Sequence, residues 1–413
     1  MSNSASNDAS NDSNAIDYSS YTLTELEQAY KDIDKDLYPA RAKTLASLIQ
    51  QKLPQDETQA HINQDDIVSK ARVIFHGSGT EFFAIWIVNL LLTIVTFGIY
   101  SAWATVRTNR YFYSNTEIAG HRLVYLALPM QILIGRLIAF ALFALVFISS
   151  SFSPIVAVSI SLIFTLFIPI IIVMGVRFRM RMMAYRNVRF NFTKRYGRAF
   201  VVFLLFPLLG LLSLYLAFPW VLKKMDEFLY ENMTYGNKEF KPSLQTSEYY
   251  VASILTSIIT FAGFMVFGIV AAIGAGTGMI DPENAGSALS LSIATVVGML
   301  FYLFILVLAY SFYQAYIRNH VYNNMQIQDV AIFSSDLKVM DLVLLSITNY
   351  LMLVFTLGMA FPWVKVRTTR LLSNATEITI LKGIDNVLAE SGGQDSAVAN
   401  EVIGAFDIDV SIG

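Results

Sequence analysis

Three apolar stretches of this chain are versions of one another, and each of them ends in tryptophan. They are NLLLTIVTFGIYSAW at residues 89–103, FPLLGLLSLYLAFPW at 206–220 and NYLMLVFTLGMAFPW at 349–363. Apolar segments that recur in a fixed order are typical of membrane proteins built from one structural unit used several times. The sequence therefore predicts an internally repeated membrane protein.

Composition separates this chain from soluble proteins. Hydrophobic residues make up 55% of its 413 residues and charged residues only 15%, and several charge-free runs exceed the roughly 20 residues that cross a bilayer. The absence of cysteine excludes disulfides and cysteine-ligated metals. Residues 1–21, rich in Asn, Ser and Asp, are predicted to be disordered, and residues 383–413 form an acidic tail. The predicted fold class is an all-α polytopic membrane protein.

The distribution of Lys and Arg tests how many of the seven apolar segments cross the membrane. If all seven cross, 16 of the 29 basic residues lie on one side and 13 on the other, so there is no bias. If the three Trp-terminated segments return to the side they came from, all 29 lie on one side. Since basic residues concentrate in the cytoplasm, the sequence favours four spans plus three re-entrant or interfacial helical elements, with both termini cytoplasmic. Seven transmembrane helices are the alternative.

A cytosolic segment, residues 22–74, precedes the repeated membrane domain at residues 75–382. Thr22 and Glu25 form a capping box, and two apolar stripes separated by a proline predict a small helical hairpin over residues 22–53, followed by a linker. The apolar face of this hairpin needs a partner, which is the membrane domain, the lipid surface or another protein.

The region around the first Trp-terminated stretch resembles a known family. It reads FHGSGTEFFAIW and then LLTIVTFGIYSAWATVRTNRYFYSNTEIAG, within residues 75–120, and is similar to the YjgN-like family of bacterial inner-membrane proteins, a domain of unknown function. The resemblance covers about residues 75–380 and implies a multi-pass protein of the bacterial inner membrane. It supplies no substrate, reaction or binding residue, so function has to be argued from the residues of this chain.

Residue types with catalytic chemistry are scarce. The four histidines are scattered outside the apolar segments, without the spacing of a metal site. HGSG at residues 76–79 lacks the lysine of a phosphate-binding loop and is interpreted as a turn. No Asp or Glu lies within a predicted span, which disfavours proton-coupled transport through a carboxylate. The sequence predicts no enzyme, no catalytic residue, no metal, no cofactor and no nucleic-acid partner.

Four polar residues recur at matching positions of the first and third stretches and are the candidate polar site within the membrane: Asn89, Thr96, Asn349 and Thr356. Their amides and hydroxyls could line a polar path between repeated units. The simpler interpretation is hydrogen bonding between helices. Arg136 lies near the start of an apolar segment, where its side chain is expected to reach back to the cytoplasmic headgroups.

Basic residues near the tryptophans suit anionic lipid headgroups, because both residue types favour the membrane interface. The candidate headgroup contacts are Arg107, Arg110, Arg367 and Arg370, together with Arg177, Arg179 and Arg181 from a cluster without acids. Membrane lipids are therefore expected partners.

Two functions fit these features. The first is a passive or facilitating transporter or lipid-handling membrane protein, in which the re-entrant elements enclose a cavity open to the basic face. The alternative is a non-catalytic membrane scaffold or assembly factor that recruits a protein partner through residues 22–53. A lipid-modifying enzyme would need a nucleophile or metal that the sequence does not offer. Substrate and oligomeric state stay open.

Overall fold

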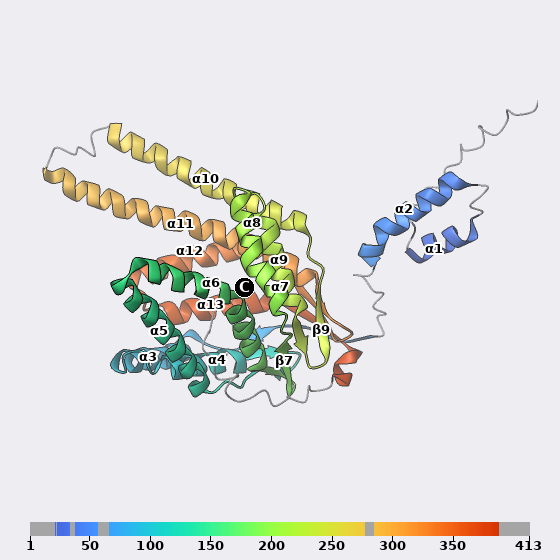
Figure 1. The fold of residues 1–413 in the computed structure, drawn as a ribbon, viewed down its shortest axis with the longest axis horizontal. Helices are drawn as coiled ribbons and strands as arrows, with labels where there is room; N and C mark the ends of the chain where they lie inside the picture. Colours follow the sequence, from blue (N-terminus) through green and yellow to red (C-terminus); the bar gives the residue numbers. More distant parts are fainter. Residues whose placement is uncertain (1–20, 22, 34–37, 57–65, 277–284, 388–413) are drawn as a thin grey trace, which may run out of the picture. The chain divides into compact units, whose positions relative to one another are not determined.

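The computed structural model describes residues 21, 23–33, 38–56, 66–276 and 285–387 (Figure 1). The chain divides into two units, residues 1–66 and residues 67–413. The predicted disorder of residues 1–20, the capping residue Thr22 and most of the acidic tail lie outside the described residues.

Two helices form the described part of the first unit, α1 (Leu23–Asp32) and α2 (Pro39–Asp56). They pack on each other, and Leu26 of α1 and Leu45 of α2 are fully buried. The apolar stripes in this part of the chain therefore form a helical hairpin, as their spacing predicts.

Five helical hairpins make up most of the described second unit. They are α3 (Gly79–Val95) with α4 (Ser101–Ser114), α5 (Pro129–Phe152) with α6 (Pro154–Arg181), the run α7 (Tyr196–Phe200), η2 (Val201–Leu205) and α8 (Phe206–Leu212) with α9 (Phe218–Glu231), α10 (Thr246–Gly276) with α11 (Ala285–Asn323), and α12 (Val339–Phe355) with α13 (Phe361–Asn374). Short and long hairpins alternate along the chain, beginning and ending with a short one.

Helix length separates the two kinds of hairpin. Within the described residues, four segments are long and apolar enough to cross a membrane: Pro129–Ser149, Pro154–Arg181, Thr246–Ile269 and Val296–Asn323. All four belong to the two long hairpins. The Trp-terminated stretches fall in the short hairpins, whose apolar helices are Gly79–Val95, Tyr196–Leu212 and Val339–Phe355. The chain is therefore a polytopic membrane protein with four candidate spans.

The expectation of an all-α fold is wrong, because the residues between the hairpins form short strands. They are β1 (Ile67–Arg72), β2 (Ile74–Phe75), β3 (Thr116–Ile118), β4 (His121–Arg122), β5 (Val124–Tyr125), β6 (Met183–Tyr185), β7 (Val188–Phe192), β8 (Met233–Tyr235), β9 (Lys238–Pro242), β10 (Met325–Ile327), β11 (Ala331–Ser335) and β12 (Thr376–Leu381). Runs of two to six residues are too short for alternation of apolar and polar residues to identify a strand.

The strands close into a ring. One sheet has the order β1-β12-β11-β10-β9-β8-β7-β6-β5 and the other the order β2-β3-β4. Val73 is the one residue between β1 and β2, and Leu123 is the one residue between β4 and β5. These two residues continue the pairing between neighbouring strands. Val73 donates its N–H to the carbonyl of Thr376 at 2.9 Å, and Leu123 donates its N–H to the carbonyl of Thr116 at 3.1 Å. Buried side chains from all around the ring form one apolar cluster inside it.

Each hairpin is closed at its base by one backbone hydrogen bond. The residue after the incoming strand donates its N–H to the carbonyl of the residue that precedes the outgoing strand, at 2.8 to 3.0 Å, in the pairs His76 to Asn115, Leu126 to Met182, Thr193 to Asn232, Ser243 to Asn324 and Asp336 to Ala375. All five hairpins therefore start and end at the ring, and Figure 1 shows their helices leading away from it.

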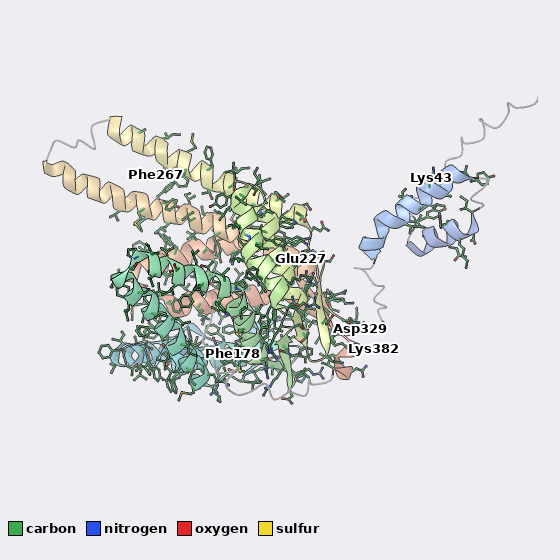
Figure 2. The ribbon with its side chains drawn as sticks, in the orientation of Figure 1. Lys43, Phe178, Glu227, Phe267, Asp329 and Lys382 are labelled. Carbon is green, nitrogen blue, oxygen red and sulfur yellow. The ribbon has the colours of Figure 1, made fainter. Side chains whose placement is uncertain are left out.

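Apolar side chains cover the helices away from the ring. At the tips of two short hairpins, Phe97 is 98% exposed and Leu357 is 94% exposed. Figure 2 shows Phe267 far along α10, whereas the charged residues Asp329 and Lys382 lie at the strand end. Exposed apolar surface of this extent is typical of a face that meets lipid.

One carboxylate is partly buried at the base of the helices. Asp226 of α9 accepts a hydrogen bond of 2.6 Å from the hydroxyl of Tyr249, and Tyr249 is fully buried. Burial raises the pKa of Asp226 to about 6, although the hydrogen bond from Tyr249 acts in the opposite direction. The folded protein therefore holds this proton more tightly than the unfolded chain, in which the pKa of Asp is near 3.9.

Replacing Asp226 by Asn should make stability less dependent on pH. Because the folded-state pKa is raised, the contribution of Asp226 to stability is most favourable below about pH 4 and falls as pH rises to about 6, by at most about 3 kcal/mol at 1.36 kcal/mol per pKa unit. Thermal unfolding in detergent should show the variant more stable than the wild type at pH 7, with the two converging near pH 4. The exposed Asp341→Asn change is the control, and a wild type that is unaffected between pH 4 and 6 would contradict the assignment.

Candidate functional site

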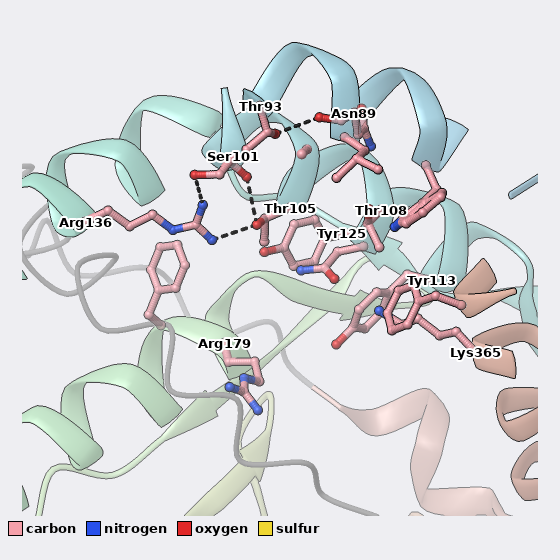
Figure 3. A pocket seen from close by; sticks show the side chains of 16 residues that line it. Asn89, Thr93, Ser101, Thr105, Thr108, Tyr113, Tyr125, Arg136, Arg179 and Lys365 are labelled. Carbon is pink, nitrogen blue, oxygen red and sulfur yellow. Dashed lines mark hydrogen bonds between the residues drawn. The ribbon is translucent and has the colours of Figure 1, made fainter. Parts of the chain in front are cut away.

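A cavity of about 610 Å³ lies against the first short hairpin. We call it the Asn89 cavity. It is lined by residues of α3, α4, β5, α5, α6 and α13: Trp86, Asn89, Leu90, Thr93, Ser101, Ala104, Thr105, Thr108, Asn109, Tyr113, Tyr125, Arg136, Phe178, Arg179, Phe361 and Lys365 (Figure 3). The size falls within the range of small-molecule sites in proteins.

Asn89 is the unusual polar residue of this cavity. Its side chain is 4% exposed, yet neither its Nδ2 nor its Oδ1 atom has a hydrogen-bond partner in the structure. A buried amide without partners costs about 1 to 3 kcal/mol, and most buried polar groups in proteins are satisfied. Both amide atoms have almost no accessible surface in this structure, so a small shift of the Asn89 side chain towards the cavity would expose them to a polar ligand.

At the same position of the third short hairpin, the side-chain amide has hydrogen-bond partners within the protein. Asn349 donates to the hydroxyl of Thr368 at 3.1 Å and accepts from Arg367 Nη1 at 3.1 Å. The matching residues of the first hairpin are Arg107 and Thr108. Thr108 lines the cavity, but Arg107 is exposed. The two hairpins thus present the same three residue types in a closed and an open arrangement.

Cationic side chains line the cavity from three different helices. Arg136 of α5 donates to Ser101 Oγ at 2.6 Å and to Thr105 Oγ1 at 2.8 Å, as Figure 3 shows. The sequence favoured a guanidinium that reaches the lipid headgroups. In the structure the guanidinium contacts the neighbouring hairpin instead. Arg179 of α6 and Lys365 of α13 complete the positive lining. The arrangement favours an anionic group.

Aromatic rings line the same cavity. Tyr113 and Tyr125 stack with their ring centroids 5.3 Å apart, and Trp86 lies 6.2 Å from Phe361. Phe178 is buried. Cations beside aromatic and aliphatic surface suit a ligand with an anionic part and an apolar part.

Thr96 and Thr356 lie outside this cavity, at the turns of their hairpins. Each hydroxyl accepts a hydrogen bond from the backbone N–H four residues later, from Tyr100 at 2.9 Å and from Ala360 at 3.0 Å. Gly98 and Gly358 follow with φ of 91° and 87°, a backbone conformation that favours glycine. The structure therefore brings Asn89 alone, of the four candidate polar residues, into the cavity.

The candidate headgroup arginines differ in their surroundings. Arg107 and Arg110 are exposed, whereas Arg370 donates to the Gly77 carbonyl at 2.7 Å and Arg367 contacts Asn349. Of the remaining cluster, Arg179 lines the Asn89 cavity, and Arg177 and Arg181 are half-buried near the end of α6.

HGSG forms a packed turn at the start of α3. His76 Nε2 lies 2.9 Å from Glu117 Oε2, and Ser78 Oγ accepts from the Glu81 N–H at 3.2 Å, which caps the helix. A Cβ atom at Gly79 would collide with the ring of Trp363. Within the described residues, no group of three or more His, Asp and Glu side chains is placed to hold a metal ion.

Several cavity residues follow a pattern that is visible in the sequence. Ser101, Thr105 and Thr108 recur at helical spacing after the first turn, so they form one polar face of α4. Lys365 comes from α13, far from this hairpin in sequence, and reaches it because the first and last hairpins pack together.

Comparison with known proteins gives a family and relatives. Residues 70–405 match the family described as "Bacterial protein of unknown function (DUF898)". The chain is 24% identical over 350 residues to "Inner membrane protein YjgN" of Escherichia coli O157:H7, covering 74% of this chain and 87% of that protein. It is 25% identical over 312 residues to the protein of the same name from Escherichia coli (strain K12), covering 65% and 78%. No solved structure matches.

Leucine at the two matching asparagines should have opposite effects on stability. Asn89→Leu removes an unsatisfied buried amide, so stability should stay the same or rise by about 1 kcal/mol. Asn349→Leu removes one hydrogen bond each from Arg367 and Thr368 and should cost about 1 to 3 kcal/mol. Thermal unfolding of both purified variants measures the difference, and equal losses would contradict the open and closed assignment.

Proposed function

We propose that this chain, which belongs to the DUF898 family of bacterial proteins, is a lipid-handling membrane protein. In this proposal it binds the anionic headgroup of a lipid in the Asn89 cavity and passively facilitates the movement of that lipid. Its relatives are named inner membrane proteins, and the bacterial inner membrane is its location. The unsatisfied amide of Asn89, beside a cavity that three cationic side chains line, is the observation that carries the proposal.

The chemistry of the cavity suits a phospholipid headgroup. A phosphate is anionic and accepts several hydrogen bonds, and the arginines and the lysine can donate to it as charge-assisted pairs. The amide of Asn89 can donate to an ester or glycerol oxygen and accept from a hydroxyl. The aromatic residues Trp86, Phe178 and Phe361 offer surface for the start of an acyl chain.

We further propose that the three short hairpins re-enter the membrane instead of spanning it. The helices Gly79–Val95 and Val339–Phe355 have 17 residues each, or about 25 Å at 1.5 Å per residue, which is less than the roughly 30 Å of a bilayer core. Their tips carry exposed apolar residues, and their bases return to the ring. This topology puts the ring and its basic residues in the cytoplasm.

Loss of the cavity's charge should weaken lipid binding. A charge-assisted hydrogen bond contributes about 1.5 to 3 kcal/mol, so Arg136→Gln should reduce affinity for phosphatidylglycerol by about tenfold or more, and Arg136→Lys should reduce it less. Binding of a fluorescent phosphatidylglycerol to detergent-purified protein measures this, with inorganic phosphate as competitor to separate headgroup from chain.

The exposed Arg122 on β4 supplies the matched control, because Arg122→Gln removes one charge outside the cavity. Equal affinity in the wild type and Arg136→Gln, or an equal loss in Arg122→Gln, would contradict a headgroup site. A scaffold role would then be favoured, since recruitment through residues 22–53 needs no lipid in this cavity.

Single cysteines test the topology directly, because the chain has no cysteine of its own. A membrane-impermeant maleimide should label Ser153→Cys, between α5 and α6, in intact cells. It should label Asn237→Cys, in the exposed turn between β8 and β9, only after permeabilisation. Labelling at both sites in intact cells would mean seven spans and contradict the re-entrant hairpins.

A further inference from the structure

The ring of strands surrounds a second cavity, which is open at its ends and which we call the lumen. Its volume is about 400 Å³. Every hairpin contributes to its wall, since the first residue of each outgoing strand faces it: Thr116, Met183, Met233, Met325 and Thr376. None of the residues that line the Asn89 cavity lines the lumen, so the two cavities have separate walls.

The two ends of the lumen differ in chemistry. At the end formed by the last turns of the helices, Arg318 donates to Thr376 Oγ1 at 2.9 Å, and its guanidinium carbon lies 4.2 Å from the ring centroid of Tyr322. Tyr230 and Ser373 also line this end. Towards the turns between strands, the wall is apolar and includes Phe240, Ile327 and Val330.

An apolar cavity of this size has room for an apolar ligand. Protein interiors are packed with few voids larger than a water molecule, and empty cavities destabilise in proportion to their volume. Apolar cavities stay dry, and one of about 150 Å³ binds benzene. At the corresponding roughly 25 Å³ per carbon, the 400 Å³ lumen fits a hydrocarbon chain of about 16 carbons.

We propose that the lumen binds a single-chain anionic amphiphile, a long-chain fatty acid or a lysophospholipid, with its anionic group at Arg318 and its chain among the apolar residues of the ring. This goes beyond the headgroup site, because it uses separate residues and a different class of lipid. The anionic end lies beside the helix ends, so the chain points away from the membrane helices and into the ring.

Chain length provides a test that misfolding would not imitate. Displacement of the fluorescent fatty acid cis-parinaric acid from amphipol-held protein, by saturated fatty acids of 8 to 20 carbons, should show an affinity optimum near 16 carbons. Ala331 lines the lumen and is 5% exposed, so Ala331→Leu adds three carbons to the wall and should shorten the optimum by about three. Ala184→Leu is the matched control, because Ala184 lies between two lumen-facing residues of β6, Met183 and Tyr185, and the optimum should not move.

The anionic group is tested separately. Arg318→Gln should abolish an expected tenfold preference for a fatty acid over the alcohol of equal length, and Arg318→Lys should retain most of it. A lysophosphatidylglycerol series alongside the fatty acids distinguishes the two sources of the chain. Absence of binding, or an optimum that Ala331→Leu does not move, would overturn the proposal. Asn89→Leu and Arg136→Gln should leave fatty acid binding unchanged, so failure here and failure of the headgroup site are distinguishable.

Discussion

The hydrogen-bonded closure of the strand ring is the constraint on which the rest of this structure depends. A strand of two or three residues has little stability by itself, and an open edge would leave N–H and C=O groups unpaired. Closing the ring through Val73 and Leu123 pairs each strand with a neighbour on both sides. Because both ends of every hairpin enter the ring, all five hairpins are held with their bases at one level.

Closure also explains why the first and last hairpins touch. Gly79 of α3 lies under the ring of Trp363 in α13, and Arg370 reaches the carbonyl of Gly77 at 2.7 Å. Arg72 of β1 forms an ion pair with Asp336, at 2.7 Å, close to where β1 pairs with β12. This contact brings Lys365 and Phe361 to the Asn89 cavity, so the site is assembled from opposite ends of the membrane domain.

The sequence predicted the helices but not the strands. The distribution of Lys and Arg, which is one-sided only if the Trp-terminated segments re-enter, favoured four spans and three re-entrant or interfacial elements. Four helices long and apolar enough to cross a membrane are present among the described residues. The strands could not be predicted from the sequence, because they follow the helices immediately and are stabilised by neighbours distant in sequence. Turn residues such as Ala119-Gly120, Arg186-Asn187 and Gly236, all with positive φ, were the available signal, since tight hairpin turns favour that conformation.

The site was predictable only in part, because identical residue types at identical positions have different surroundings. Asn89 and Asn349 are equivalent in sequence, yet Arg367 folds back onto Asn349 while Arg107 is exposed. Arg367 is further held by Thr348 at 3.1 Å and by the sulfur of Met352 at 3.0 Å; the first hairpin has Val88 and Leu92 at those positions. Val88 and Leu92 offer neither a hydroxyl nor a sulfur acceptor, so an arginine there gains less by turning inward. Two small side-chain differences thus account for one closed hairpin and one that keeps a cavity open for a ligand.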